Sequence, residues 1–190
     1  MSFLTFAALP LHETRRTFLT KSGLTLSAAA VAVLAGREAL AKGSAATESD
    51  ARILNTALGA ELEAIAAYQV GAESGLLQKP VLDLAVTFQD HHKQHADLLA
   101  KTVTKLGGKP ATARTKYAFP TGTLKTQEDV LRFAAMLEKG AVSAYLGAVP
   151  LFGNRDLSKA AASILGDEAM HWAVLRQALG EPPVPVAFVS

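Results

Sequence analysis

Two pairs of potential metal ligands are each spaced three residues apart in the sequence. Glu168 and His171 form one pair near the end of the chain, and His92 and His95 form the other, far upstream. Side chains three positions apart lie on the same face of an α-helix. The two side chains of each pair could therefore bind the same metal ion. A single pair of this kind arises easily by chance. It indicates a metal site only if other candidate ligands recur at matching intervals in the sequence.

These pairs belong to a longer internal repeat. Glu61 precedes His95 by almost the same interval as Glu138 precedes His171. Tyr68 and Tyr145 each follow their glutamate by seven positions. The chain is therefore interpreted as two copies of one helix-pair unit. The candidate metal ligands at matching places are Glu61, His92, His95, Glu138, Glu168 and His171.

Apolar residues recur every three or four positions in four segments, which is typical of helices that bury one face. The segments run from about 51 to 73, 80 to 106, 127 to 149 and 155 to 178. Each of the six candidate ligands falls on an apolar stripe, a position that the pattern reserves for the core. Glu63 and His91 fall off the stripes, so we expect them to point away from the centre.

The segments between these helices complete the predicted fold, an all-α four-helix bundle running up and down. Residues 109–125 are long for a link between antiparallel helices. They suit a crossover between the second and third helices, with Tyr117 and Phe119 as anchors. Residues 42–50 are expected to form a flexible lead-in. The proline-rich tail is expected to pack back on the bundle through Val186, Phe188 and Val189.

The charges on the stripes favour a metal site. Three carboxylates occupy core positions, and no lysine or arginine lies near them on the stripes. An unpaired buried carboxylate costs several kcal/mol, and a divalent cation would offset that cost. Carboxylate and imidazole groups suit Fe and Mn, and also Zn. A single core histidine more often packs and hydrogen-bonds than binds metal, and Tyr68 and Tyr145 are interpreted as packing residues.

The N-terminal residues 1–41 have the composition of a removable targeting segment. Arg15 and Arg16 precede an apolar stretch from Gly23 to Ala35, which is too short to span a bilayer. Ala39 and Ala41 offer a cleavage site, which leaves residues 42–190 as the bundle domain with no predicted membrane span. Residues 14–21 resemble the twin-arginine signal. That resemblance implies a partnership with the twin-arginine export machinery and a periplasmic or otherwise exported location.

Composition excludes several classes of function. Of the 19 basic and 17 acidic residues, four and two lie before Lys42, so the remaining chain carries 15 of each sign. A neutral domain gives no electrostatic case for binding nucleic acid or an anionic membrane. The chain has no cysteine, so disulfides, thiolate metal sites and cysteine nucleophiles are excluded. Assembly as a homo-oligomer stays open.

The candidate ligands lie in stretches that resemble the ferritin-like superfamily, in particular exported bacterial proteins with a ferritin-like domain. The stretches are LNTALGAELEAIAAY, LEKGAVSAYLGAVPL and GDEAMHWAVL. The resemblance covers about residues 51–189 and implies a di-iron or di-manganese carboxylate centre. It also implies that Glu61 and Glu138 are terminal ligands, that Glu168 is a bridging ligand, and that His95 and His171 each bind one ion.

His92 departs from the family pattern, which has a second bridging glutamate at this position. An imidazole removes one negative charge and one bridging group, so a single ion or a weakly bridged pair is favoured over a tightly bridged pair. The leading hypothesis is an exported metal-binding protein holding one or two ions of Fe, Mn or Zn, with oxidase or peroxide-handling activity. The alternative is a non-catalytic stress or interaction protein that has lost its metal chemistry.

Overall fold

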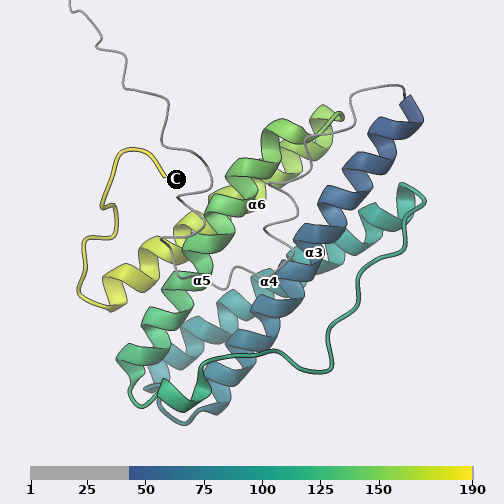
Figure 1. Cartoon of the computed structure of the whole chain (residues 1–190). Helices are drawn as coiled ribbons and strands as arrows, with labels where there is room; N and C mark the ends of the chain where they lie inside the picture. Colours follow the sequence, from purple (N-terminus) through teal and green to yellow (C-terminus); the bar gives the residue numbers. More distant parts are fainter. Residues whose placement is uncertain (1–42, 190) are drawn as a thin grey trace, which may run out of the picture.

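The computed structural model describes residues 43–189 (Figure 1). Four long α-helices make up most of this part of the chain: α3 (Gly43–Glu73), α4 (Lys79–Lys105), α5 (Gln127–Ala148) and α6 (Arg155–Ala178). Two single-turn 3-10 helices, η1 (Thr121–Thr123) and η2 (Val149–Leu151), flank α5. The described residues contain no strand, which confirms the predicted all-α class. The predicted export signal, including Arg15 and Arg16, lies outside the described residues.

The four helices form two antiparallel hairpins that pack against each other. α3 lies along α4 and α5 lies along α6, and the hairpins meet where α3 contacts α5 and α4 contacts α6. The connector from α4 to α5 runs from one end of the bundle to the other (Figure 1). This arrangement confirms the predicted up-down bundle with a long crossover. Within the crossover, Phe119 stacks on Tyr117 and meets the ring of Phe133 edge-on, so both predicted anchors contact aromatic neighbours.

Local sequence signals fix where the helices begin and end. Thr126 and Asp129 form a capping box at the start of α5, and the Asn154 side chain accepts a hydrogen bond from the Asp156 N–H at the start of α6. Gly107 and Gly180 adopt positive φ angles of 82° and 73° just beyond α4 and α6. Only glycine takes this conformation without a steric penalty, so these residues terminate the helices cleanly.

The N-terminal part of α3 differs from the sequence prediction. Residues 43–50 are helical rather than a flexible lead-in. The reason is a tertiary contact that composition does not reveal. The buried Asp50 carboxylate accepts hydrogen bonds from the backbone N–H groups of Gly153 (2.9 Å) and Asn154 (3.0 Å). Asp50 therefore anchors the start of α3 to the α5–α6 connection instead of capping its own helix.

Two apolar clusters lie on either side of the central layer of the bundle. One contains Leu54, Leu58, Leu99, Val103, Tyr145 and Ile164. The other contains Tyr68, Phe88, Leu131, Ala135, Trp172 and Leu175. On every helix the candidate ligands fall between the members of these two clusters. The apolar packing therefore sets the spacing of the four helices around one polar layer.

The C-terminal tail does not pack on the bundle as the sequence predicted. Val186 and Val189 are exposed, and Phe188 is 88% exposed. The tail is held near its start, where Arg132 and Arg176 pair with Glu181 and Arg176 Nε donates to the Pro182 carbonyl oxygen. Among residues 43–189, no helix is long and apolar enough to cross a membrane.

The Asp50 anchor gives a stability prediction. Asp50→Ala leaves the N–H groups of Gly153 and Asn154 without acceptors, so the free energy of unfolding should fall by about 1–3 kcal/mol. Urea denaturation followed by circular dichroism measures the change. Asp83→Ala is the matched control, because the Asp83 carboxylate forms an exposed pair with Lys79; this variant should lose less than about 1 kcal/mol. Equal losses in the two variants would contradict the anchor.

Candidate metal centre

The structure brings all six candidate ligands together in the middle of the bundle. α3 supplies Glu61 and α5 supplies Glu138, while α4 and α6 each supply a pair separated by one helical turn. All are buried except His95, whose side chain is 14% exposed, and Glu168 is fully buried. The full set is Glu61, His92, His95, Glu138, Glu168 and His171.

One group of four residues could hold an ion on the α3–α4 side of the layer. Glu61, His92, His95 and Glu168 each offer one atom, and these atoms lie within 4.8 Å of one another. His95 Nδ1 is 3.2 Å from Glu168 Oε1 and 3.6 Å from Glu61 Oε2. His92 Nδ1 is 2.8 Å from Glu61 Oε2. This half contains two imidazoles and one carboxylate of its own, with Glu168 reaching across from α6.

A second group lies on the α5–α6 side and shares two residues with the first. His171 Nδ1 is 3.5 Å from Glu138 Oε1 and 3.7 Å from Glu168 Oε2. His92 Nε2 is 3.3 Å from Glu138 Oε1. Glu168 therefore presents one oxygen to each half, which is the placement expected of a bridging ligand. His92 presents one ring nitrogen to each half and occupies the matching position on α4.

Four buried ligand atoms in this layer have no hydrogen-bond partner among the described residues. They are both carboxylate oxygens of Glu168, His95 Nδ1 and His171 Nδ1. Most buried polar atoms in folded proteins are hydrogen-bonded, so four unsatisfied atoms facing a common space require an explanation. A divalent cation in each half would satisfy them in pairs, one pair being His95 Nδ1 with Glu168 Oε1 and the other His171 Nδ1 with Glu168 Oε2. The residues present therefore fit a metal ion.

Two tyrosines fix the orientation of the terminal glutamates. The Tyr145 hydroxyl donates to Glu61 Oε1 at 2.6 Å, and the Tyr68 hydroxyl donates to Glu138 Oε1. Burial, together with the neighbouring glutamates, raises the pKa of each tyrosine well above its usual value. Both tyrosines are thus neutral donors. Each holds a carboxylate from the opposite hairpin, which explains why the seven-residue spacing recurs in the two halves.

The three histidines change the charge balance inferred from sequence. Burial alone lowers the pKa of His92, but contact with Glu138 and Glu61 outweighs burial and raises it to about 11. Burial is likewise outweighed at His95 by Glu168 and Glu61, and at His171 by Glu138 and Glu168, and each pKa rises to about 9. Protonated imidazoles can therefore neutralise the carboxylates without metal, a source of positive charge that the sequence analysis did not consider.

The carboxylates respond unequally to this environment. Burial opposes ionisation of Glu61 and Glu138, but contact with the histidines outweighs it and lowers the pKa of both groups. At Glu168, burial dominates and the Glu138 charge adds to it, so the pKa rises to about 7 in spite of His171 and His95. Glu168 is thus the carboxylate whose charge is least compensated, and it is also the one with both oxygens unpartnered.

His91 belongs to neither central group, as predicted, but it contacts one of their members, His171. His91 Nδ1 lies 2.9 Å from His171 Nε2 and 3.1 Å from Asp167 Oδ2. Sequence analysis missed Asp167, whose Oδ2 is also 3.3 Å from His95 Nε2 and from His171 Nε2. A signal was present, because His91 and Asp167 stand at matching positions just before His92 and Glu168. The expectation for Glu63 holds, since it belongs to none of these groups.

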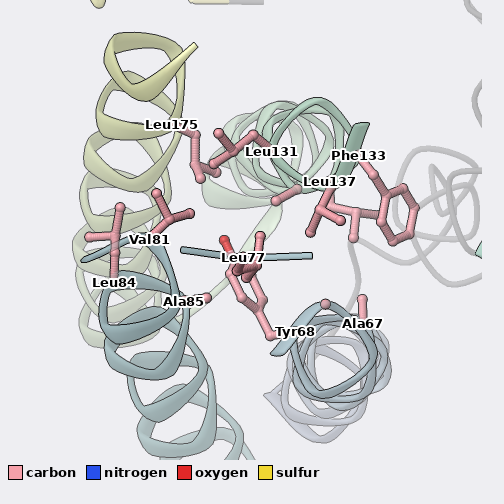
Figure 2. Close-up of a pocket in the computed structure, with 13 residues that line it drawn as sticks. Ala67, Tyr68, Leu77, Val81, Leu84, Ala85, Leu131, Phe133, Leu137 and Leu175 are labelled. Carbon is pink, nitrogen blue, oxygen red and sulfur yellow. The ribbon is translucent and has the colours of Figure 1, made fainter. Parts of the chain in front are cut away.

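An apolar cavity of about 30 Å³ lies beside the centre, on the side of the apolar cluster that contains Tyr68, Leu131 and Leu175 (Figure 2). Leu77, Val81, Leu131 and Leu175 point into it, together with the ring of Tyr68. Its lining offers no charged group, so this cavity is not a cation site. Tyr68 lies between the cavity and the polar layer. Its ring lines the cavity, and its hydroxyl donates a hydrogen bond to Glu138.

Comparison with known proteins assigns the fold independently. Residues 49–181 match the family described as a ferritin-like domain. The chain is similar to the crystal structure of a conserved hypothetical protein, rv2844, from Mycobacterium tuberculosis, with 22% identity and a TM-score of 0.65. That similarity covers 75% of this chain and 99% of the other. At this identity it supports the fold alone. No curated protein matches the chain at a significant level.

The pKa shifts predict how the metal-free protein responds to pH. Because His92, His95 and His171 have a higher pKa when folded, their stabilisation is complete below pH 6.5 and is lost as pH rises through 9 to 11. Glu168 acts in the same direction between pH 4.5 and about 7. Glu61 and Glu138 act oppositely, and their stabilisation is lost below pH 4.5.

The free energy of unfolding of chelator-treated protein should therefore fall by at least about 1 kcal/mol between pH 6.5 and 8.5. Urea titrations at several pH values measure it. His95→Gln should flatten the decline, because it removes one of the three titrating imidazoles. Stability that is constant or rises over this range would show that the imidazoles are neutral in the folded protein.

Proposed function

Because the chain belongs to the family of ferritin-like domain proteins, we propose that its bundle interior binds ions of iron, manganese or zinc. The four unpartnered ligand atoms around Glu168 carry this proposal. Glu138, Glu168 and His171 would hold one ion, and Glu61, His95 and Glu168 would hold the other. Mixed carboxylate and imidazole ligands suit these three metals. A bound iron or manganese ion would supply the one-electron chemistry needed for an oxidase or peroxide-handling activity.

The residues of the chain would prepare this site in three ways. Tyr145 and Tyr68 each donate to one oxygen of a terminal glutamate and so hold its carboxylate in the polar layer. The two apolar clusters exclude water from either side of the layer. Glu168, whose pKa is raised to about 7 by burial, would be ionised by a bound cation, since a cation stabilises the charged form of a carboxylate.

His92 limits how many ions the site holds tightly. Its imidazole is paired with Glu61 through Nδ1 and with Glu138 through Nε2, so its proton must leave before it can bind a metal. Two adjacent cations need bridging anions between them, and a protonated imidazole repels both. We therefore favour one tightly held ion in the α5–α6 half, with a weaker second site.

The same observation supports the alternative function. Three imidazoles and three carboxylates neutralise one another if all six groups are charged, and the bundle then needs no metal. In that case the protein is a non-catalytic stress or interaction protein whose polar layer specifies the packing of its helices. The four unpartnered atoms favour metal binding over this alternative, because mutual neutralisation leaves them without partners.

A metal titration distinguishes the two functions. Apo-protein titrated anaerobically with Fe(II), Mn(II) and Zn(II) should bind about one ion tightly per chain. Glu168→Gln removes the shared carboxylate charge and should weaken binding by roughly a hundredfold. His92→Glu restores a second bridging carboxylate and should raise the stoichiometry towards two. Isothermal calorimetry with elemental analysis of the desalted protein gives both quantities.

Glu63→Gln provides the matched control, because Glu63 is on α3 but outside the centre; its binding curve should match that of the wild type. A wild-type protein that binds none of the three metals would establish the alternative. If it binds two ions tightly and His92→Glu changes nothing, His92 does not block the bridging position.

The location proposed for the protein is periplasmic or otherwise exported, through the twin-arginine route. Arg15 and Arg16, the short apolar stretch after them and the Ala39–Ala41 cleavage site support this proposal. Export of the folded chain would let the metal be inserted before the protein leaves the cytoplasm.

Replacing both arginines by lysine should retain the precursor in the cytoplasm, as measured by immunoblotting of cell fractions. Arg37→Lys, which lies outside the paired motif, is the control and should leave export unchanged. Normal export of the double variant would show that another route is used.

A further inference from the structure

We propose that His91, Asp167 and the Nε2 atom of His171 form a second, outer cation site that delivers divalent metal ions to the buried centre. The site itself follows from its own geometry. Its delivery role rests on the proposed metal binding by the buried centre.

The three atoms of the outer site are already spaced as metal ligands. His91 Nδ1 to His171 Nε2 is 2.9 Å, His91 Nδ1 to Asp167 Oδ2 is 3.1 Å, and His171 Nε2 to Asp167 Oδ2 is 3.3 Å. Metal–ligand bonds of about 2.0–2.2 Å in a tetrahedral site separate neighbouring ligand atoms by roughly 3.3–3.6 Å. One ion can therefore contact all three with small side-chain movements, leaving its fourth position to water.

Exposure rises in steps from the buried centre to the surface along this path. Glu168 is fully buried, whereas the side chains of Asp167 and His91 are 21% and 38% exposed. Both lie where α4 faces α6. An ion from solvent can reach His91 and Asp167 directly, but it can reach Glu168 only by passing the residues that surround it.

His171 connects the two sites through opposite ring nitrogens. Its Nε2 faces His91 and Asp167, and its Nδ1 faces Glu138 and Glu168. A neutral imidazole has one nitrogen free to bind metal and one that carries a proton. The ring can therefore bind an outer ion or an inner ion, but not both. The outer site should be emptied when the inner site fills, which is the behaviour of a delivery site.

The ring of His171 is held in place, so the change of partner requires no rotation. Phe88 stacks on it with ring centres 3.9 Å apart and planes 22° apart. Binding of an inner ion through Nδ1 would require the tautomer of His171 that carries its proton on Nε2. Asp167 then accepts a hydrogen bond from Nε2, and this bond would hold the ring in the tautomer that the buried ion needs.

The first test measures the rate of loading. Wild-type apo-protein and His91→Gln are mixed with Co(II), and the visible absorption of bound Co(II) is followed by stopped flow. His91→Gln should load at least fivefold more slowly and reach the same final stoichiometry in the buried centre. Asp90→Asn is the matched control, because Asp90 is the exposed neighbour of His91 on α4 and its carboxylate accepts a hydrogen bond from Gln94; it should load at the wild-type rate.

The second test isolates the outer site. The double variant Glu61→Gln, Glu138→Gln removes two carboxylates from the buried centre and leaves His91, Asp167 and His171 intact. It should bind one Co(II) weakly, and adding His91→Gln should abolish that binding. Circular dichroism confirms that the variants are folded.

The two tests separate this inference from the proposed function. If the double variant binds no Co(II), the outer site is wrong. An unchanged loading rate in His91→Gln, or a loss of final affinity instead of rate, would overturn the delivery role and make His91 a positioning residue. Failure of wild-type protein to fill the buried centre, with weak binding retained in the double variant, would refute the proposed function and leave the outer site standing.

Discussion

The burial of Glu168 is the constraint on which the rest of the polar layer depends. A fully buried carboxylate with two unpartnered oxygens is costly, because nothing replaces the water it gives up. Its neighbours His95 and His171 approach within 3.2–3.7 Å but are not aligned to donate hydrogen bonds to it. The raised pKa of Glu168 is the direct consequence. A cation bound between these atoms would turn a destabilising arrangement into a stabilising one.

Two features of the bundle keep this layer in place. Apolar clusters pack on either side of it, and hydrogen bonds join the two hairpins across it. The apolar clusters fix how closely the helices approach. Tyr68 on α3 donates to Glu138 on α5, and Tyr145 on α5 donates to Glu61 on α3, so the two hairpins are joined by reciprocal hydrogen bonds through the candidate ligands. Removing either tyrosine hydroxyl would free a buried carboxylate oxygen, which connects the stability of the fold to the geometry of the site.

The two halves of the repeat have diverged in a way that affects the surface as well as the centre. α6 carries Asp167 and Glu168 where α4 carries His91 and His92. The α4 half therefore has two imidazoles in place of two carboxylates. In the centre, His92 adds positive charge between Glu61 and Glu138. At the edge of the layer, His91 adds a nitrogen opposite Asp167, and the result is a polar path that leads from solvent to His171.

The sequence determined the helices, their inward faces and the six residues that meet in the centre. It could do so because a residue on an apolar stripe must face the core once the helix packs, whatever its partners are. The long segment after α4 likewise predicted the crossover, since only a connection of that length spans the bundle. The resemblance to ferritin-like proteins rested on the same residues.

Only the tertiary structure decided which atoms face each other. Helical spacing placed His91 about 100° from the stripe, but α6 packs closely enough for His91 to reach His171 and Asp167. The same limit explains why the anchoring role of Asp50 was not predicted, since its partners Gly153 and Asn154 lie far away in sequence. It also explains the raised pKa of the three imidazoles, because most of the carboxylates that cause it lie on other helices. Periodicity assigns a residue to a face; contacts, hydrogen bonds and pKa values depend on the separation between helices, which no single helix encodes.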